Sequence, residues 1–127
     1  MATFDYIRAS DSDAAHSIRL TNSSGCSNIG ISELATVLAN PKRSYFTPFA
    51  TVIQNTDMWK AIQYSFEYHP NDHQILVVTR TMEKHHGSEQ VNHTETTQVY
   101  RFDADSIADM RTTIAVAKGF SAKHSKL

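Results

Sequence analysis

The groups most able to do chemistry are seven histidines in a chain of 127 residues: His16, His69, His73, His85, His86, His93 and His124. Neutral imidazoles that converge can bind zinc. Their spacing matches no closed zinc pattern, however, and the lone Cys26 excludes a Cys-based cluster and an intrachain disulfide. We therefore expect no metal ion and no other cofactor.

Motifs of the common enzyme classes are absent from the sequence. It holds no GxGxxG, GxxxxGKS/T, HExxH, GxSxG or CxxC pattern. We expect that the chain is not an enzyme. The alternative is a His-based metal enzyme, which bound zinc and loss of activity in His85→Ala or His93→Ala would reveal.

A second set of candidates lies on a segment with a two-residue period. Ile62, Tyr64, Phe66 and Tyr68 alternate with Gln63, Ser65, Glu67 and His69, which predicts a β-strand. We expect the stripe Tyr64, Phe66 and Tyr68 to face the core. The alternative is an exposed stripe that stacks nucleobases, as in single-strand binders.

If the aromatic stripe faces the core, the other side of the sheet is rich in hydroxyl and amide groups. Such groups hydrogen-bond phosphates, sugars and bases without a large positive charge, and a solvated sheet face is the simpler alternative. Apolar residues lie on both faces of the second strand, so its side-chain parity stays open. On that side we expect Gln63, Ser65, Glu67 and His69, joined by some of Thr79, Arg80, Thr81, Asn92, Thr94, Thr96 and Gln98.

The elements that position these residues form an α+β chain. The pattern predicts an N-terminal hairpin over 1–21, from strands Thr3–Arg8 and His16–Thr21 joined by a turn at Ala9–Ala15. A turn-rich connection at Asn22–Asn28 and a short helix over 31–38 follow, and Pro41 ends that helix. We expect 44–59 to be irregular, with one short strand at most.

The rest of the chain is expected to be a three-strand antiparallel meander over 60–102 and a helix over 105–119. Turns are predicted at Pro70–Asp72 and His85–Glu89. Asp103–Ser106 supplies helix N-cap residues, and Gly119 followed by Phe120 resembles a C-terminal cap. A basic tail, Ser121–Leu127, would follow. The chain is predicted to be one domain, 1–127.

Composition and charge bear on two kinds of binding partner, nucleic acid and membrane. A net charge of -1 and 40% apolar residues favour a globular chain but give no support to nucleic-acid binding. No run approaches the roughly 18 apolar residues of a membrane span, so we expect no membrane partner. The N-terminus lacks a secretory signal pattern, which favours the cytoplasm.

Coverage of the sheet suggests self-association. A helix of roughly 14 residues cannot cover five or six strands, and a partner chain in a symmetric dimer would protect the exposed edges and apolar surface. The alternative is that 44–59 covers the sheet within the chain.

The order of elements resembles the coat proteins of the small single-stranded RNA bacteriophages. Lys60–Glu83 is similar to the central hairpin of that family, and Asn92–Phe120 to its last strand and the helix that crosses the partner subunit. Thr3–Leu38, with the stretch Gly25–Ala35, is similar to its N-terminal hairpin and following loop. Two segments depart from the family: 40–58 looks longer, and the loop 85–91 looks shorter.

The resemblance implies a capsid protein found in the virion and assembled in the bacterial cytoplasm. Its sheets would join edge to edge in a dimer, its C-terminal helix would be packed by dimerisation, and dimers would build an icosahedral shell. An RNA hairpin of the genome on the inner sheet face would direct packaging and repress replicase translation. The resemblance implies that the RNA-binding residues are Gln63, Ser65, Thr79, Arg80, Thr81, Asn92, Thr94, Thr96 and Gln98. The alternative function is a small cytoplasmic phage or bacterial α+β binding protein, such as an inhibitor of a defence system.

Overall fold

The computed structural model describes residues 1–7 and 16–125, with the side chains of the last helix described as far as Lys118. The elements are β1 (Thr3–Ile7), β2 (Ser17–Asn22), β3 (Gly25–Gly30), α1 (Ile31–Ala39), β4 (Tyr45–Phe46), β5 (Ala50–Gln54), β6 (Met58–His69), β7 (Gln74–His85), β8 (Asn92–Arg101) and α2 (Ala104–Ser125). These elements confirm the predicted α+β class with antiparallel sheets and a C-terminal helix.

The N-terminal hairpin belongs to a small sheet of its own, with strand order β1-β2-β3. Strands β1 and β2 pair as predicted, while their connecting turn lies outside the described residues. The turn-rich connection predicted after Thr21 is wrong, because β3 pairs along the whole of β2. Only Ser23 and Ser24 turn the chain, and the Asn22 Oδ1 atom accepts hydrogen bonds from the Ser24 and Gly25 amides at 2.8 and 3.0 Å.

The predicted meander is confirmed as the body of a second sheet with strand order β4-β6-β7-β8, in which β5 also pairs with β6. The strands β6 and β7 each run for 12 residues. The turn at Pro70–Asp72 closes through His73, whose φ of 52° lies in the left-handed region. The segment 44–59 contributes two short strands, β4 and β5, to the sheet, so the prediction of an irregular segment with one short strand is wrong. The alternative that this segment covers a sheet face is wrong as well, because both strands lie within the sheet.

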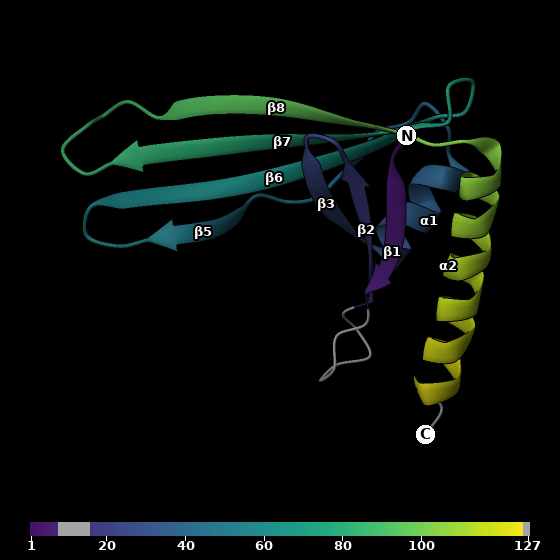
Figure 1. Ribbon diagram of the computed structural model, residues 1–127. Helices are drawn as coiled ribbons and strands as arrows, with labels where there is room; N and C mark the ends of the chain where they lie inside the picture. The colour runs from purple at the N-terminus through teal and green to yellow at the C-terminus, as the bar shows by residue number, and fades with distance from the viewer. Residues whose placement is uncertain (8–15, 126–127) are drawn as a thin grey trace.

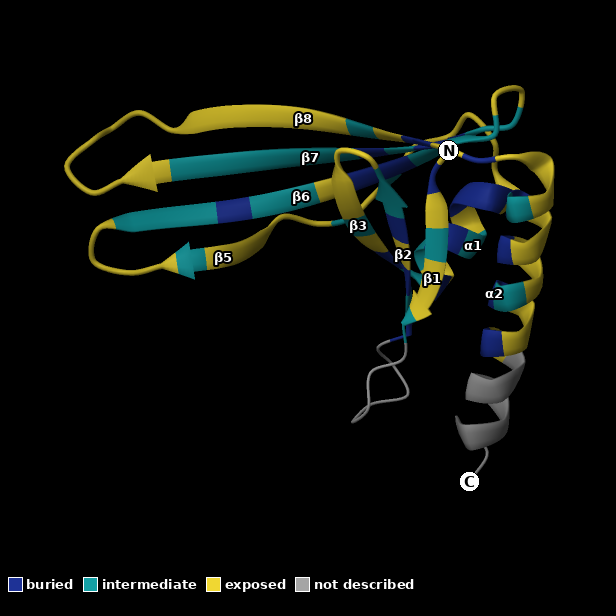
Figure 2. Ribbon diagram, in the orientation of Figure 1, coloured by how far each residue is buried: buried dark blue, intermediate teal, exposed yellow. Residues whose placement is uncertain are grey.

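The core lies at one end of the large sheet. Phe66 and Tyr68 are buried there, together with Ile75 and Val77 of β7 and Tyr100 of β8. They meet the buried side chains of α1, α2 and the small sheet. The Tyr100 hydroxyl also shares a 2.6 Å hydrogen bond with the Ser27 Oγ atom, which ties β8 to β3. Figure 2 shows most of the buried segments at this end, while the buried Ala61 lies farther out along β6.

The other end of the large sheet extends past the helices and the small sheet (Figure 1). We call this part the arm; it consists of 58–64, 79–85 and 92–96. No described helix or second sheet covers the arm on either face. Tyr64 is 41% exposed there, so its predicted burial in the core is wrong, although its ring stacks on that of Phe66.

Helix α2 runs for 22 residues and does not end at Gly119 as predicted; the side chain of Phe120 lies outside the described part. Its start is confirmed, because the Asp103 Oδ1 atom accepts a 2.7 Å hydrogen bond from the Ser106 amide. The buried stripe Ile107, Met110, Ile114 and Ala117 joins the core of its own chain. Among the described helices, none is long and apolar enough to cross a membrane.

Candidate nucleic-acid interface

Strands β6, β7 and β8 present two faces, because side chains alternate along each strand and directly paired residues share a face. We call the face with Phe66 and Tyr68 the core face, and the face with Ser65 and Glu67 the open face. Tyr64 pairs with Thr79, and Thr79 pairs with Thr96, so these three lie on the core face. Gln63 pairs with Arg80, which pairs with Glu95, so these three lie on the open face.

This register divides the nine predicted RNA-binding residues between opposite faces. Gln63, Ser65 and Arg80 lie on the open face. The core face carries Thr79, Thr81, Asn92, Thr94, Thr96 and Gln98. The prediction of one continuous surface is therefore wrong, since the third strand was assigned the parity of the first without a known register. The register also settles the parity of β7 that the sequence left open: Arg80 points to the open face, whereas Thr79 and Thr81 point to the core face.

Arg80 is the centre of the open-face group. Its Nε atom lies 3.1 Å from the Glu95 Oε2 atom, and an Nη atom donates to the Ser65 Oγ atom at 3.1 Å. The guanidinium also lies over the Phe46 ring, 5.6 Å from its centroid. Three contacts with three different strands hold this cation in one place, beside a shallow hollow of about 210 Å³ lined in part by Phe49 and His93.

Glu95 and Phe46 were not singled out in the sequence. The contact of Phe46 with Arg80 depends on the pairing of β4 with β6, which places Phe46 opposite Ser65. No sequence period links residues 34 positions apart, so only the folded sheet reveals the group.

Charge distinguishes the two faces. On β6 to β8 the open face carries the cations Arg80, Lys84 and Arg101 against the carboxylates Glu67 and Glu95. The core face carries Lys60 against Glu83, which are direct cross-strand partners. An anionic ligand is therefore attracted more strongly to the open face, although Glu95 neutralises much of the Arg80 charge.

The core-face candidates form a polar patch of hydroxyl groups on the arm. Thr79 pairs with Thr96, and Thr81 pairs with Thr94 and makes a hydroxyl–hydroxyl contact with it. Asn92, Thr94 and Thr96 are exposed. These groups can donate and accept hydrogen bonds, but they bring no charge that would attract phosphate.

The described histidines are dispersed. His69 lies 3.1 Å from the Glu67 carboxylate and His85 lies 2.9 Å from that of Glu83, while the buried His16 contacts the Tyr6 hydroxyl. Within 1–7 and 16–125, no group of three or more His, Cys, Asp or Glu side chains is placed to hold a metal ion. The His124 side chain lies outside the described part, and Cys26 is exposed on β3.

Comparison of the chain with protein-family models, with curated proteins and with solved structures finds no match. The candidate interface therefore rests on the geometry of this chain.

Proposed function

We propose that this chain is a capsid protein that forms dimers through its large sheet, assembles into a shell and packages single-stranded RNA. The observation that carries the proposal is the arm, which exposes both faces and ends in the unpaired strand β8. In the described chain, no strand pairs with the outer side of β8. The unpaired N–H and C=O groups of such an edge are a template for pairing with another chain.

The hydrogen bonds at one end of β8 identify which backbone groups point outward. The Val99 carbonyl accepts a 2.9 Å hydrogen bond from the Asn22 side chain, and the Arg101 carbonyl accepts one from the Ala2 amide. Since backbone groups alternate along a strand, Thr97, Glu95 and His93 also point their N–H and C=O groups outward. The edge is blocked near Val99 and open from Asn92 to Gln98.

A second copy of the chain is the partner that fits this edge. Two β8 strands related by a two-fold axis pair in antiparallel fashion, which continues the sheet across both chains. Because the open edge spans Asn92 to Gln98, the two arms pair with each other. It also leaves one long open face on the dimer, on which RNA lies against Gln63, Arg80 and the nearby cations. Ser65 is only 5% exposed and serves to hold Arg80 in place.

The proposal predicts the mass and nucleic-acid content of the purified protein. Size-exclusion chromatography with light scattering, and absorbance at 260 and 280 nm on the same peak, is expected to give a megadalton peak rich in RNA. A nucleic-acid-free peak at one or two chains would contradict the proposal and favour the small binding protein.

A matched pair of variants tests which face meets RNA. Thr97 and Thr96 are adjacent, both exposed, and point to the open face and the core face respectively. We expect Thr97→Glu to lower the RNA content at unchanged folding, because the added charge repels phosphate. Thr96→Glu is the control and is expected to retain the RNA. The reverse result would place RNA on the core face.

A further inference from the structure

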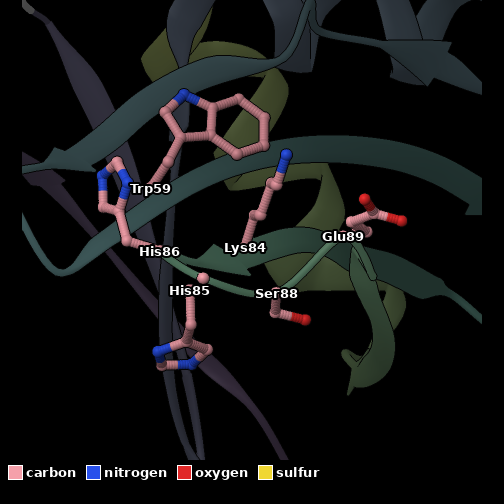
Figure 3. A pocket seen from close by; sticks show the side chains of 7 residues that line it. Trp59, Lys84, His85, His86, Ser88 and Glu89 are labelled. Carbon is pink, nitrogen blue, oxygen red and sulfur yellow. The ribbon is translucent and has the colours of Figure 1, made fainter.

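The tip of the arm holds a pocket of about 420 Å³ on the open face, away from the Arg80 group. Pockets of this size accommodate small ligands. Its walls come from the start of β6, the end of β7 and the loop that follows. Trp59 and Lys84 are direct cross-strand partners, so both project from the open face into the pocket. Figure 3 shows them side by side, with His86 beside Trp59 and Glu89 at the opposite end.

Hydrogen bonds between two loops shape the pocket before any ligand arrives. The Asn55 Oδ1 atom accepts from the Asp57 and Met58 amides at 2.9 and 2.8 Å, which closes the turn before β6. The His86 amide donates to the Asp57 carbonyl at 2.9 Å, and the His86 Nε2 atom donates to the Asn55 carbonyl at 3.1 Å. A preformed wall lowers the entropy lost on binding.

The chemistry of the lining side chains fits a nucleotide. The Trp59 indole offers an extended aromatic surface on which a base can stack, and the Lys84 ammonium offers a charge for a phosphate. Glu89 repels phosphate and accepts hydrogen bonds from the amino group of a base such as cytosine. His85 points away from the pocket in Figure 3 and pairs with Glu83.

We infer that this pocket binds one unstacked nucleotide of a single-stranded RNA, with its base against Trp59 and its phosphate at Lys84. The inference rests on the proposed function for the identity of the ligand, and it adds a contact outside the Arg80 group. RNA that lies along the open face would then be anchored at the tip of each arm.

Trp59 is the single tryptophan of the chain, so its fluorescence reports on this pocket alone. The experiment titrates the full-length protein, freed of nucleic acid, with short oligocytidylate, with cytidine monophosphate and with polyphosphate. Stacking of a base quenches an indole, whereas polyphosphate has no base. We expect quenching by the oligomer and none by polyphosphate.

Variants are tested by the anisotropy of a labelled oligocytidylate. Trp59→Leu is expected to weaken binding by about tenfold, in line with the loss of one stacked base. Lys84→Gln is expected to reduce the slope of log affinity against log salt concentration by about 1. Lys60→Gln is the matched control, because Lys60 lies next to Trp59 on the core face and its loss removes the same charge.

Three results would overturn the inference. They are an unquenched Trp59 in the presence of bound oligomer, equal effects of Lys60→Gln and Lys84→Gln, and quenching by cytidine monophosphate without quenching by the oligomer. A small protein without a shell would contradict the capsid proposal while leaving the titration measurable. If the protein forms RNA-filled shells but bound oligomer does not quench its Trp59 fluorescence, the pocket inference fails and the capsid proposal stands.

Discussion

At the scale of single residues, Phe66 and Tyr64 show that the position of a residue along the strand decides whether its side chain is buried. Both lie on the core face of β6, two positions apart, yet Phe66 is 4% exposed and Tyr64 is 41% exposed. The small sheet and the helices reach Phe66 but not Tyr64. Residues with the same place in the sequence period therefore make different contributions to stability.

We expect Phe66→Ala to lower the free energy of unfolding by about 3–5 kcal/mol, because it removes a buried ring and leaves a cavity. Tyr64→Ala is the matched control, and its effect on the isolated chain is expected to be well below that of Phe66→Ala. Urea unfolding followed by circular dichroism measures both. Equal losses of stability would mean that the arm is covered within one chain.

At the scale of elements, the start of α2 depends on one ionised side chain. The hydrogen bond from the Ser106 amide, followed by that from the Ser106 hydroxyl, lowers the pKa of Asp103. The carboxylate form therefore stabilises the helix above the unfolded pKa of about 3.9. This stabilisation is lost as the pH falls through the lower pKa of the folded chain.

We accordingly expect Asp103→Ala to lower the Tm at neutral pH, with a difference from wild type that shrinks as the solution is acidified. Thermal melts of helical ellipticity over a pH series measure this difference. Asp103→Asn is the control, since asparagine also caps helices but does not titrate. A deficit of Asp103→Ala that stayed constant down to strong acid would contradict the role of the charge.

At the scale of the whole molecule, the proposed dimer depends on the edge of β8. The Thr97 N–H points outward, whereas the Thr96 N–H points toward β7, as the outward carbonyls of Val99 and Arg101 require. Proline lacks an N–H and is tolerated only where that group is not used within the sheet. The two positions thus separate folding from association.

We expect Thr97→Pro to fold as a monomer, because it removes only an outward donor. Thr96→Pro is expected to be destabilised, because it breaks the ladder between β7 and β8. Light scattering gives the mass and circular dichroism the fold. Assembly of Thr97→Pro at the mass of the wild type would exclude pairing through β8.

The amino-acid sequence by itself determined the local elements of this protein. The alternation around Tyr64 and Phe66 is strong enough to define β6, and Asp103 marks the start of α2, because both signals depend on neighbours along the chain. The end of α2 was not determined in this way, since one glycine in a helix costs only about 1 kcal/mol and packing can override it. Strand β3 was missed because Asn and Gly are uncommon in strands.

Only the tertiary structure decided which residues of neighbouring strands share a face of the sheet. The period of two says that Thr94 and Thr96 share a face, but the register with β7 is needed to show that this is the face of Phe66 rather than that of Ser65. The same register brings Trp59 beside Lys84, which are far apart in sequence. Cross-strand pairing is a long-range property, so the candidate site became visible only in the folded sheet.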